Sequence, residues 1–389
     1  MLRLITTTIT LILLAACGDS TGPGGGGGGA TLSGTVRVAG QTVTVAGATV
    51  SVGTLKATSD ENGRFELTSV PVDSATVRAE RPGYEPAEAT ITLSAGANTH
   101  DFVLTAKEIY LLGNTAVLVP SGTAAIGGAI IVVGSNGTRG FITGEPIHGS
   151  DNPDLEQSLQ EWAASVRSLA RSRHVALLGA NDNPSNSAAS DEAFFAALRT
   201  VAASSGHAEL AEAPVLGMSL SETEMGGLVS RHPDRAIGLL ARVPPGAASL
   251  VAVEALAVPT FVMQAGLDNP SLNHAVQAAF AANRAHGGLW ALAVEPDVRH
   301  EQASARGNAA ATGWISRVLD LRLPSTPGDQ LITLGEQSGW LGNQSTLSIA
   351  PWADYVGNRA TASWLLNEAT AGSWKLLGAP PGSGGGGGE

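Results

Sequence analysis

The sequence predicts two folded units in a chain of 389 residues: a small antiparallel β-sandwich, then a mostly parallel sheet flanked by helices. Hydrophobic residues make up 43% of the chain and charged residues 14%, which is enough apolar material for two cores. Residues 31–104 consist of short β-rich runs broken by turns. Beyond Lys107, strand-like apolar runs alternate with segments of helical period, so the boundary is expected near residue 106.

The first 16 residues have the composition of a signal peptide. Arg3 precedes an apolar stretch that ends in Ala15 and Ala16, and this stretch is too short to span a membrane in the mature protein. The string L-A-A-C at residues 14–17 resembles the bacterial lipobox, in which cleavage exposes a cysteine that is then acylated. The resemblance implies a lipid anchor at Cys17 and a place in the bacterial cell envelope, facing the periplasm or the exterior. The alternative is an ordinary signal peptide with a chance cysteine.

Cys17 is also the only cysteine, which excludes disulfides, cysteine-based zinc sites and a cysteine nucleophile. Residues 17–30 include six consecutive glycines and are expected to form a flexible tether.

The first unit, residues 31–106, is expected to contain six strands. They are residues 32–38, 48–52, 64–67, 75–79, 89–93 and 101–104. Asn62 and Gly63 supply the positive φ of a tight hairpin, and Asp60 and Glu61 beside them are read as turn formers and not as calcium ligands.

The strings S-G-T-V at 33–36, G-A-T-V at 47–50, T-S-D-E-N-G-R-F at 58–65 and G-Y at 83–84 resemble the carboxypeptidase regulatory-like domain, a transthyretin-like β-sandwich. The resemblance implies a non-catalytic spacer or binding module.

The second unit, residues 107–323, begins with an apolar run at 129–133 that is typical of a central parallel strand and ends in a glycine-rich loop. A helix is expected from residue 152, a strand at 174–179, a helix at 191–203 and a strand at 213–216.

The last of these strands runs into G-M-S-L-S at residues 217–221, followed by a helical pattern. Strand, sharp turn and helix are the context of a nucleophile elbow, in which the turn forces the central residue into strained backbone angles. This string and R-H-P-D-R at 231–235 resemble the α/β-hydrolase family over about residues 110–320. The resemblance implies a serine hydrolase with Ser219 as nucleophile, although Ser221 stands where the family usually has glycine. The alternative is a strand-to-helix turn without catalysis.

The family supplies its acid and its base downstream of the serine, in the order Ser, Asp, His. Asp268 follows the strand that begins at residue 258, and His300 follows the strand at 290–294, so the resemblance implies Asp268 as the acid and His300 as the base. Asp297 and His148 are the rivals for these roles. The short separations between the three positions leave no room for a large lid, and we expect an open site.

Acyl transfer also needs N–H donors for the oxyanion. The resemblance implies the backbone N–H of Leu220 as one donor and that of Ser135 or Asn136 as the other; the alternative for the latter loop is a plain glycine-rich turn. No cofactor is expected, because the sequence has neither an H-E-x-x-H string nor a phosphate-binding glycine loop.

Residues 324–376 are rich in aromatic residues and are expected to pack on the hydrolase unit, with a wall of the substrate pocket as the alternative. Four of the seven tryptophans lie there: Trp340, Trp352, Trp364 and Trp374. A glycine-rich tail at 377–389 is expected to be disordered.

The formal charge of -12 without a basic stripe argues against nucleic-acid binding. The expected function is hydrolysis of a small or polymeric carboxylic ester through an acyl-enzyme at the envelope. The alternative is a non-catalytic surface binding or scaffold protein, and the oligomeric state stays open.

Overall fold

The structure is a computed structural model. It describes residues 29–134, 138–147, 153–180, 187–220, 225–242, 255–299 and 304–380. The chain divides into two compact units, which are described separately. The N-terminal unit is built mainly from residues 29–37, 43–79 and 87–102, and the C-terminal unit takes residues 38–42, 80–86 and 103 onward. Cys17 lies outside the described residues.

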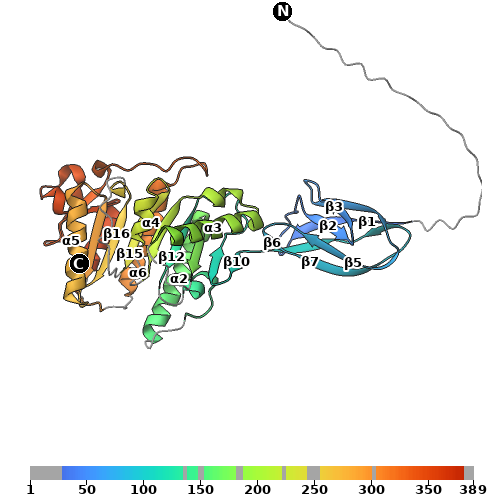
Figure 1. The fold of residues 1–389 in the computed structure, drawn as a ribbon, viewed down its shortest axis with the longest axis horizontal. Helices are drawn as coiled ribbons and strands as arrows, with labels where there is room; N and C mark the ends of the chain where they lie inside the picture. Colours follow the sequence, from blue (N-terminus) through green and yellow to red (C-terminus); the bar gives the residue numbers. More distant parts are fainter. Residues whose placement is uncertain are drawn as a thin grey trace, which may run out of the picture. The chain divides into compact units, whose positions relative to one another are not determined.

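The β-sandwich predicted for the N-terminal region is confirmed. One sheet has the order β4-β1-β9-β6, with β8 pairing in parallel with β1, and the other has the order β3-β2-β5-β7. Figure 1 shows this unit as strands without helices. The strands are β1 (Ala30–Val38), β2 (Thr49–Val52), β3 (Leu55–Thr58), β4 (Arg64–Val70), β5 (Asp73–Glu80), β6 (Tyr84–Glu85), β7 (Ala87–Leu93), β8 (Gly96–Thr99) and β9 (Phe102–Ala106).

The turn before β4 forms as the sequence predicts. Gly63 has a φ of 72°, and its N–H donates to the Asp60 carbonyl at 2.9 Å. The Asp60 carboxylate accepts from the backbone N–H groups of Asn62 and Arg64 at 2.9 and 2.8 Å, so it stabilises the turn.

The C-terminal unit is an α/β domain built on one eight-stranded, mostly parallel sheet. Its order is β10-β11-β13-β12-β14-β15-β16-β17, and all neighbours are parallel except β11, which is antiparallel to both β10 and β13. The strands are β10 (Ile109–Leu112), β11 (Thr115–Leu118), β12 (Gly128–Val133), β13 (Val175–Ala180), β14 (Val215–Ser219), β15 (Ala236–Arg242), β16 (Thr260–Ala265) and β17 (Trp290–Glu295).

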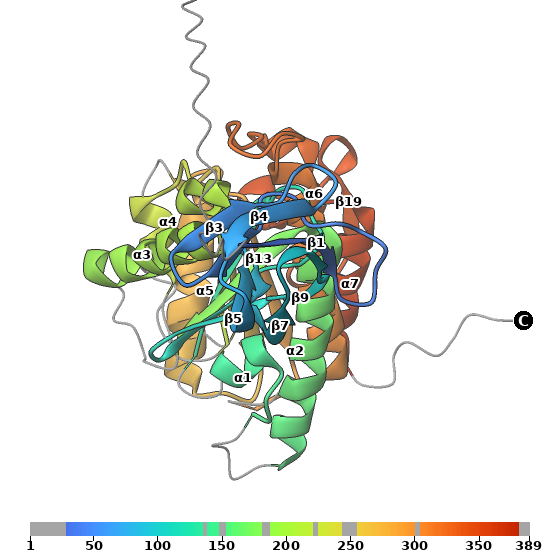
Figure 2. The same ribbon diagram turned by 90° about the vertical axis from the view of Figure 1, so that its right-hand side faces the viewer.

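Helices cover both faces of this sheet, as central parallel strands require. Figure 2 shows α3, α4 and α5 on one side and α2, α6 and α7 on the other. The helices are α1 (Thr138–Thr143), α2 (Pro153–Arg173), α3 (Ala188–Ser205), α4 (Gly226–Arg231), α5 (Pro270–Ala285), α6 (Ala305–Arg322) and α7 (Glu368–Gly378). None of the helices in the described segments is both long and apolar enough to cross a membrane.

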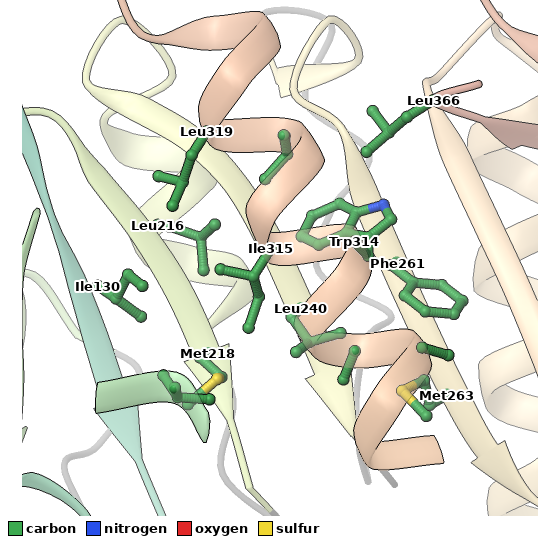
Figure 3. Packing of buried hydrophobic residues seen from close by; sticks show 14 of the residues in the cluster. Ile130, Leu216, Met218, Leu240, Phe261, Met263, Trp314, Ile315, Leu319 and Leu366 are labelled. Atoms are coloured by element: carbon green, nitrogen blue, oxygen red, sulfur yellow. The ribbon is translucent and has the colours of Figure 1, made fainter. Parts of the chain in front are cut away.

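The side chains of β12 to β16 alternate between two buried cores. On the α6 side, Trp314, Ile315 and Leu319 pack against residues of the central strands (Figure 3). The strand residues seen there include Ile130, Leu216, Met218, Leu240, Phe261 and Met263. Because each strand is apolar on both faces, only the ends of the strands are free to carry polar side chains.

The C-terminal extension adds to the core on the α6 side. It forms a small antiparallel sheet of β18 (Trp340–Gly342), β19 (Ile349–Pro351) and β20 (Ser363–Leu365), followed by α7. Trp364 and Trp374 are each 2% exposed, and the Trp374 Nε1 donates to the Leu292 carbonyl of β17 at 2.5 Å. These two tryptophans are therefore core residues.

Candidate active site

Ser219 is the last residue of β14, in the middle of the parallel sheet. It pairs in register with Val133 of β12 on one side and with Ala241 of β15 on the other, and it is 1% exposed. The carboxyl ends of parallel strands are where ligands bind in folds of this kind. Ser219 therefore has the place in the sheet that the sequence predicts for a nucleophile.

The backbone at Ser219 differs from the expected strained turn. Ser219 is an extended strand residue, held by ladder pairing on both sides. Among the described residues, the positive φ angles of non-glycine residues occur elsewhere, at Ser69, Asp73, His174 and Leu347. The backbone thus stays extended to the end of β14 at Ser219.

The same pairing engages the Leu220 amide. Its N–H donates to the Val133 carbonyl at 2.9 Å. This N–H can serve an oxyanion only after that bond opens, so the role of Leu220 stays a prediction. Ser135 and Asn136, the other predicted donors, lie outside the described residues, as do Ser221, His148 and His300.

Asp268 lies in the turn after β16 and is half-buried. Its backbone N–H donates to the Ala265 carbonyl at 3.2 Å, and its Oδ1 accepts from the Asn269 N–H at 2.7 Å. The carboxylate is thus held at the carboxyl edge of the sheet, two strands from Ser219.

The Asp268 turn is hydrogen-bonded to the segment that follows β17. The Gly266 N–H donates to the Glu295 carbonyl at 2.7 Å, and the Leu267 N–H donates to the Val298 carbonyl at 2.9 Å. The side chains of Ala265 and Val298 pack together beneath these bonds. The turn that carries the predicted acid therefore lies against the chain that leads, two residues after Val298, to the predicted base.

Gly266 makes this approach possible. A Cβ at residue 266 would lie 2.6 Å from the Pro296 Cα and 2.7 Å from the Glu295 carbonyl oxygen, closer than real Cβ contacts come. The glycine just before Leu267 and Asp268 is the feature of the sequence that could have revealed this contact.

Asp297, the rival acid, is on the surface. It is exposed and forms an ion pair with Arg306 of α6. The choice between Asp268 and Asp297 as the acid stays a prediction.

Three buried polar residues at the same edge of the sheet were not predicted from the sequence. Arg242, Gln264 and Glu295 stand at or next to the ends of β15, β16 and β17, and each is 3% exposed. Each is the first polar residue after an apolar run, which is the signal that could have found them. In the described segments, no group of three or more His, Cys, Asp or Glu side chains is arranged to hold a metal ion.

Arg242 is held by helices on the α6 side. Its Nη1 donates to the Asn308 Oδ1 at 2.6 Å, and its guanidinium lies 5.0 Å from the centre of the Trp162 ring. Burial lowers the pKa of Arg242 to about 10, against the opposing effect of the Glu295 charge. Arg242 therefore stays a cation at neutral pH.

Residues 31–105 match the sequence model of the carboxypeptidase regulatory-like domain, in agreement with the sandwich described above. No curated protein matches the chain in sequence.

Several solved structures are similar to parts of the chain. The esterase PE8 is 17% identical with a TM-score of 0.34, over 52% of this chain and 97% of that one. An α/β serine hydrolase without a lid from Xanthomonas campestris is 15% identical with a TM-score of 0.32, over 66% of this chain and 98% of that one. A type II cohesin-X-dockerin complex from Acetivibrio cellulolyticus is 26% identical with a TM-score of 0.19, over 21% of this chain and 60% of that one. The chain spans only 53% to 64% of the length of the first solved structures that it matches.

Proposed function

We propose that the C-terminal unit, carried behind a carboxypeptidase regulatory-like domain, is a serine hydrolase that acts on carboxylic esters. Ser219 attacks the ester carbonyl while His300 removes its proton, and Asp268 orients the imidazole. The serine oxygen bonds to the carbonyl carbon and the alcohol leaves with the proton from His300. Water, deprotonated by the same imidazole, then releases the acid and restores Ser219.

One observation carries the proposal: the Asp268 turn is hydrogen-bonded to the segment leading to His300, at the edge where Ser219 ends its strand. Only β15 separates β14 from β16, so at the usual spacing the two strand ends are about 10 Å apart. A loop that reaches back from β17 would bring an imidazole between the carboxylate and the hydroxyl. Ester chemistry is preferred over peptide hydrolysis only by analogy with similar tethered hydrolases.

A second candidate function is a non-catalytic scaffold that keeps this fold for surface display. It is favoured by the 1% exposure of Ser219 and by the bond between Leu220 and Val133, since both oppose direct attack on a substrate. The two functions differ in whether the Ser219 hydroxyl reacts.

A fluorophosphonate probe tests this difference. We expect the wild-type protein to be labelled and to hydrolyse short-chain nitrophenyl esters, and Ser219→Ala to lose both properties. Ser230→Ala is the matched control, because its buried hydroxyl has no hydrogen-bond partner among the described residues. A folded wild-type protein that is not labelled would favour the scaffold, and labelling that persists in Ser219→Ala would place the nucleophile elsewhere.

We also propose that acylation of Cys17 anchors the protein to the membrane, with residues 17–30 as tether. The N-terminal unit would then stand between the lipid and the hydrolase unit along the chain. This location suits a hydrolase whose substrate lies outside the cytoplasm.

A further inference from the structure

A pocket opens at the edge of the sheet opposite to the one that carries Ser219. Its volume of about 570 Å³ is in the range of pockets that bind small molecules. Three segments line it: the loop between β11 and β12, the carboxyl end of α2, and the carboxyl end of α6 with the residues that follow. Because β12 and β14 are parallel, the start of β12 and the end of β14 lie at opposite edges. The pocket is therefore separate from the candidate active site.

One part of the pocket wall is apolar. Leu319, Leu323, Pro324 and Pro327 line it from α6 and from the residues after that helix. Leu319 is buried in the core, whereas Leu323 and the two prolines are partly exposed. A ligand with a short apolar chain would lose water-exposed surface against these side chains, which favours binding.

The lining residues that carry a fixed charge are Arg173 and Asp320, and they form an ion pair. The Arg173 Nη1 donates to the Asp320 Oδ1, and the Nη2 donates to the Oδ2 at 3.1 Å and to the Ser316 Oγ at 2.8 Å. The side chains of Arg173 and Asp320 are 37% and 32% exposed. The pair is thus electrically neutral, and a ligand can reach the Asp320 carboxylate from the solvent.

The carboxyl ends of two long helices give the pocket a negative potential. Helix α2 has 21 residues and α6 has 18, and the last turns of both line the pocket. Each such end carries about half a negative charge. Of the other arginines in these turns, Arg171 donates to the Glu108 carboxylate and Arg322 donates to the Ala236 carbonyl inside the core. The pocket therefore favours a cation over an anion.

His174 adds a polar group at the same place. Its φ of 51° is in the left-handed region, which is uncommon for a residue other than glycine. Its carbonyl accepts from the Gly127 N–H at 2.9 Å, so the backbone that follows α2 is fixed against the start of β12. The imidazole is exposed at the pocket, where a ring nitrogen can accept a hydrogen bond from an ammonium group.

We propose that this pocket binds a small organic cation, with an ammonium group beside Asp320 and the carboxyl ends of α2 and α6, and an apolar chain against Leu323 and the two prolines. The ammonium group competes with Arg173 for the Asp320 carboxylate. The inference does not depend on the proposed function, because no residue of the pocket has a part in ester hydrolysis.

The test measures binding of hexylammonium to the full chain by isothermal titration calorimetry at constant ionic strength. Hexanol and hexanoate are the neutral and anionic probes of the same chain length. Asp320→Asn removes the carboxylate, and Arg173→Gln removes the cation that competes for it. Glu192→Gln is the matched control, because the Glu192 carboxylate also forms a surface ion pair with an arginine, Arg199 of α3.

We expect hexylammonium to bind with a Kd on the order of 1 mM, and at least about threefold more tightly than hexanol or hexanoate. Asp320→Asn should weaken binding at least about fivefold, because it leaves the positive charge of Arg173 uncompensated. Arg173→Gln should strengthen binding at least about threefold, because the Asp320 carboxylate is then available to the ligand. Glu192→Gln should bind as the wild-type protein does.

Opposite effects of the two variants of one ion pair distinguish a role in binding from a loss of stability. A folded wild-type protein that shows no saturable binding of hexylammonium would overturn the inference. Hexanol or hexanoate binding as tightly as hexylammonium would overturn it too, since the pocket would then select only the chain. A change in the same direction in Asp320→Asn and Arg173→Gln would contradict the competition for Asp320 and so the proposed site. Ester hydrolysis is measured separately, so either proposal can fail alone.

Discussion

Gly266 lies where the turn that carries Asp268 contacts the segment after β17. Its amide reaches the Glu295 carbonyl and its missing side chain leaves room for Pro296. The contact needs close approach and not an unusual backbone angle, because Gly266 is not among the glycines with positive φ. A methyl group added at this position would therefore push the turn that carries Asp268 away from the segment that leads to His300.

We predict that Gly266→Ala lowers the free energy of unfolding by about 1–3 kcal/mol, the usual cost of overpacking, and lowers the rate of fluorophosphonate labelling at least about tenfold through misplacement of the base. Gly313→Ala is the control: no atom lies within 4 Å of a Cβ there, and alanine in the middle of α6 should stabilise by about 0.5–1 kcal/mol. Urea denaturation and labelling kinetics measure both effects. Equal labelling rates in the two variants would contradict a role for the loop contact.

At the residue scale, the sequence predicted Ser219 at the end of a strand, from the G-M-S-L-S string, and Asp268 in the loop after a strand, and the structure has both residues at these places. It did not reveal the extended backbone of Ser219, which depends on pairing with β12 and β15. Nor did it reveal Glu295, since only the arrangement of α6 shows that a charge can be buried there.

Among the elements, helix α2 is linked to the residue before β10 through the Glu108 carboxylate. Glu108, just before β10, accepts from the Arg171 Nε at 3.0 Å and from the N–H and Oγ of Ser121 at 3.1 and 2.8 Å. Burial alone would raise the pKa of Glu108, but these hydrogen bonds and the Arg171 charge outweigh it, and the pKa is lowered. The lowered pKa means that folding favours the ionised form.

We therefore predict that Glu108→Gln destabilises the protein at pH 7 by about 1 kcal/mol. The stability that ionised Glu108 supplies is present above its unfolded pKa and is lost as pH falls through the lower, folded pKa, so the difference from wild type should shrink at acid pH. Urea midpoints across the acid range measure it. Glu145→Gln, which removes an exposed ion pair with Arg139, should change stability little at any pH, and a Glu108→Gln difference that does not vary with pH would contradict the assignment.

The sequence predicted the longer elements better than the short ones. Six strands of the sandwich, the strands β12, β13, β14, β16 and β17, and helices α2 and α3 were identified from alternation and helical period. Strand β15 and the 18-residue helix α6 were not assigned from the sequence. The strands β3, β6 and β8, the hairpin of β10 and β11, and helix α1 were missed. They have two to six residues each, too few for a period to show, and they form because a neighbouring strand or helix pairs or packs with them.

For the molecule as a whole, the two fold classes and their order follow from the sequence. Near residue 106 the pattern changes from short β-rich runs to strands that alternate with helical segments. The topology of the second sheet does not, since nothing in the sequence states that β13 lies between β11 and β12.

We predict that Cys17→Ser moves the protein from the membrane fraction to the soluble fraction of a bacterial host and abolishes incorporation of an alkyne fatty acid. Acyl chains anchor a protein because their methylene groups are buried in the membrane. A serine at residue 17 has no thiol and cannot form the thioether that attaches the lipid. Ser20→Ala, three residues away in the same tether, should leave both properties unchanged. An unaltered distribution of the Cys17→Ser protein would rule out the anchor.

The extended, covered backbone of Ser219 has a kinetic consequence. Because Ser219 is 1% exposed, an electrophile can reach its hydroxyl only after a local opening of the site. When such an opening precedes bond formation, the observed inactivation rate stops rising once reagent is abundant, and the plateau equals the opening rate itself. The plateau would then be common to reagents of very different reactivity, so chemically dissimilar inhibitors would share one maximum rate set by the protein.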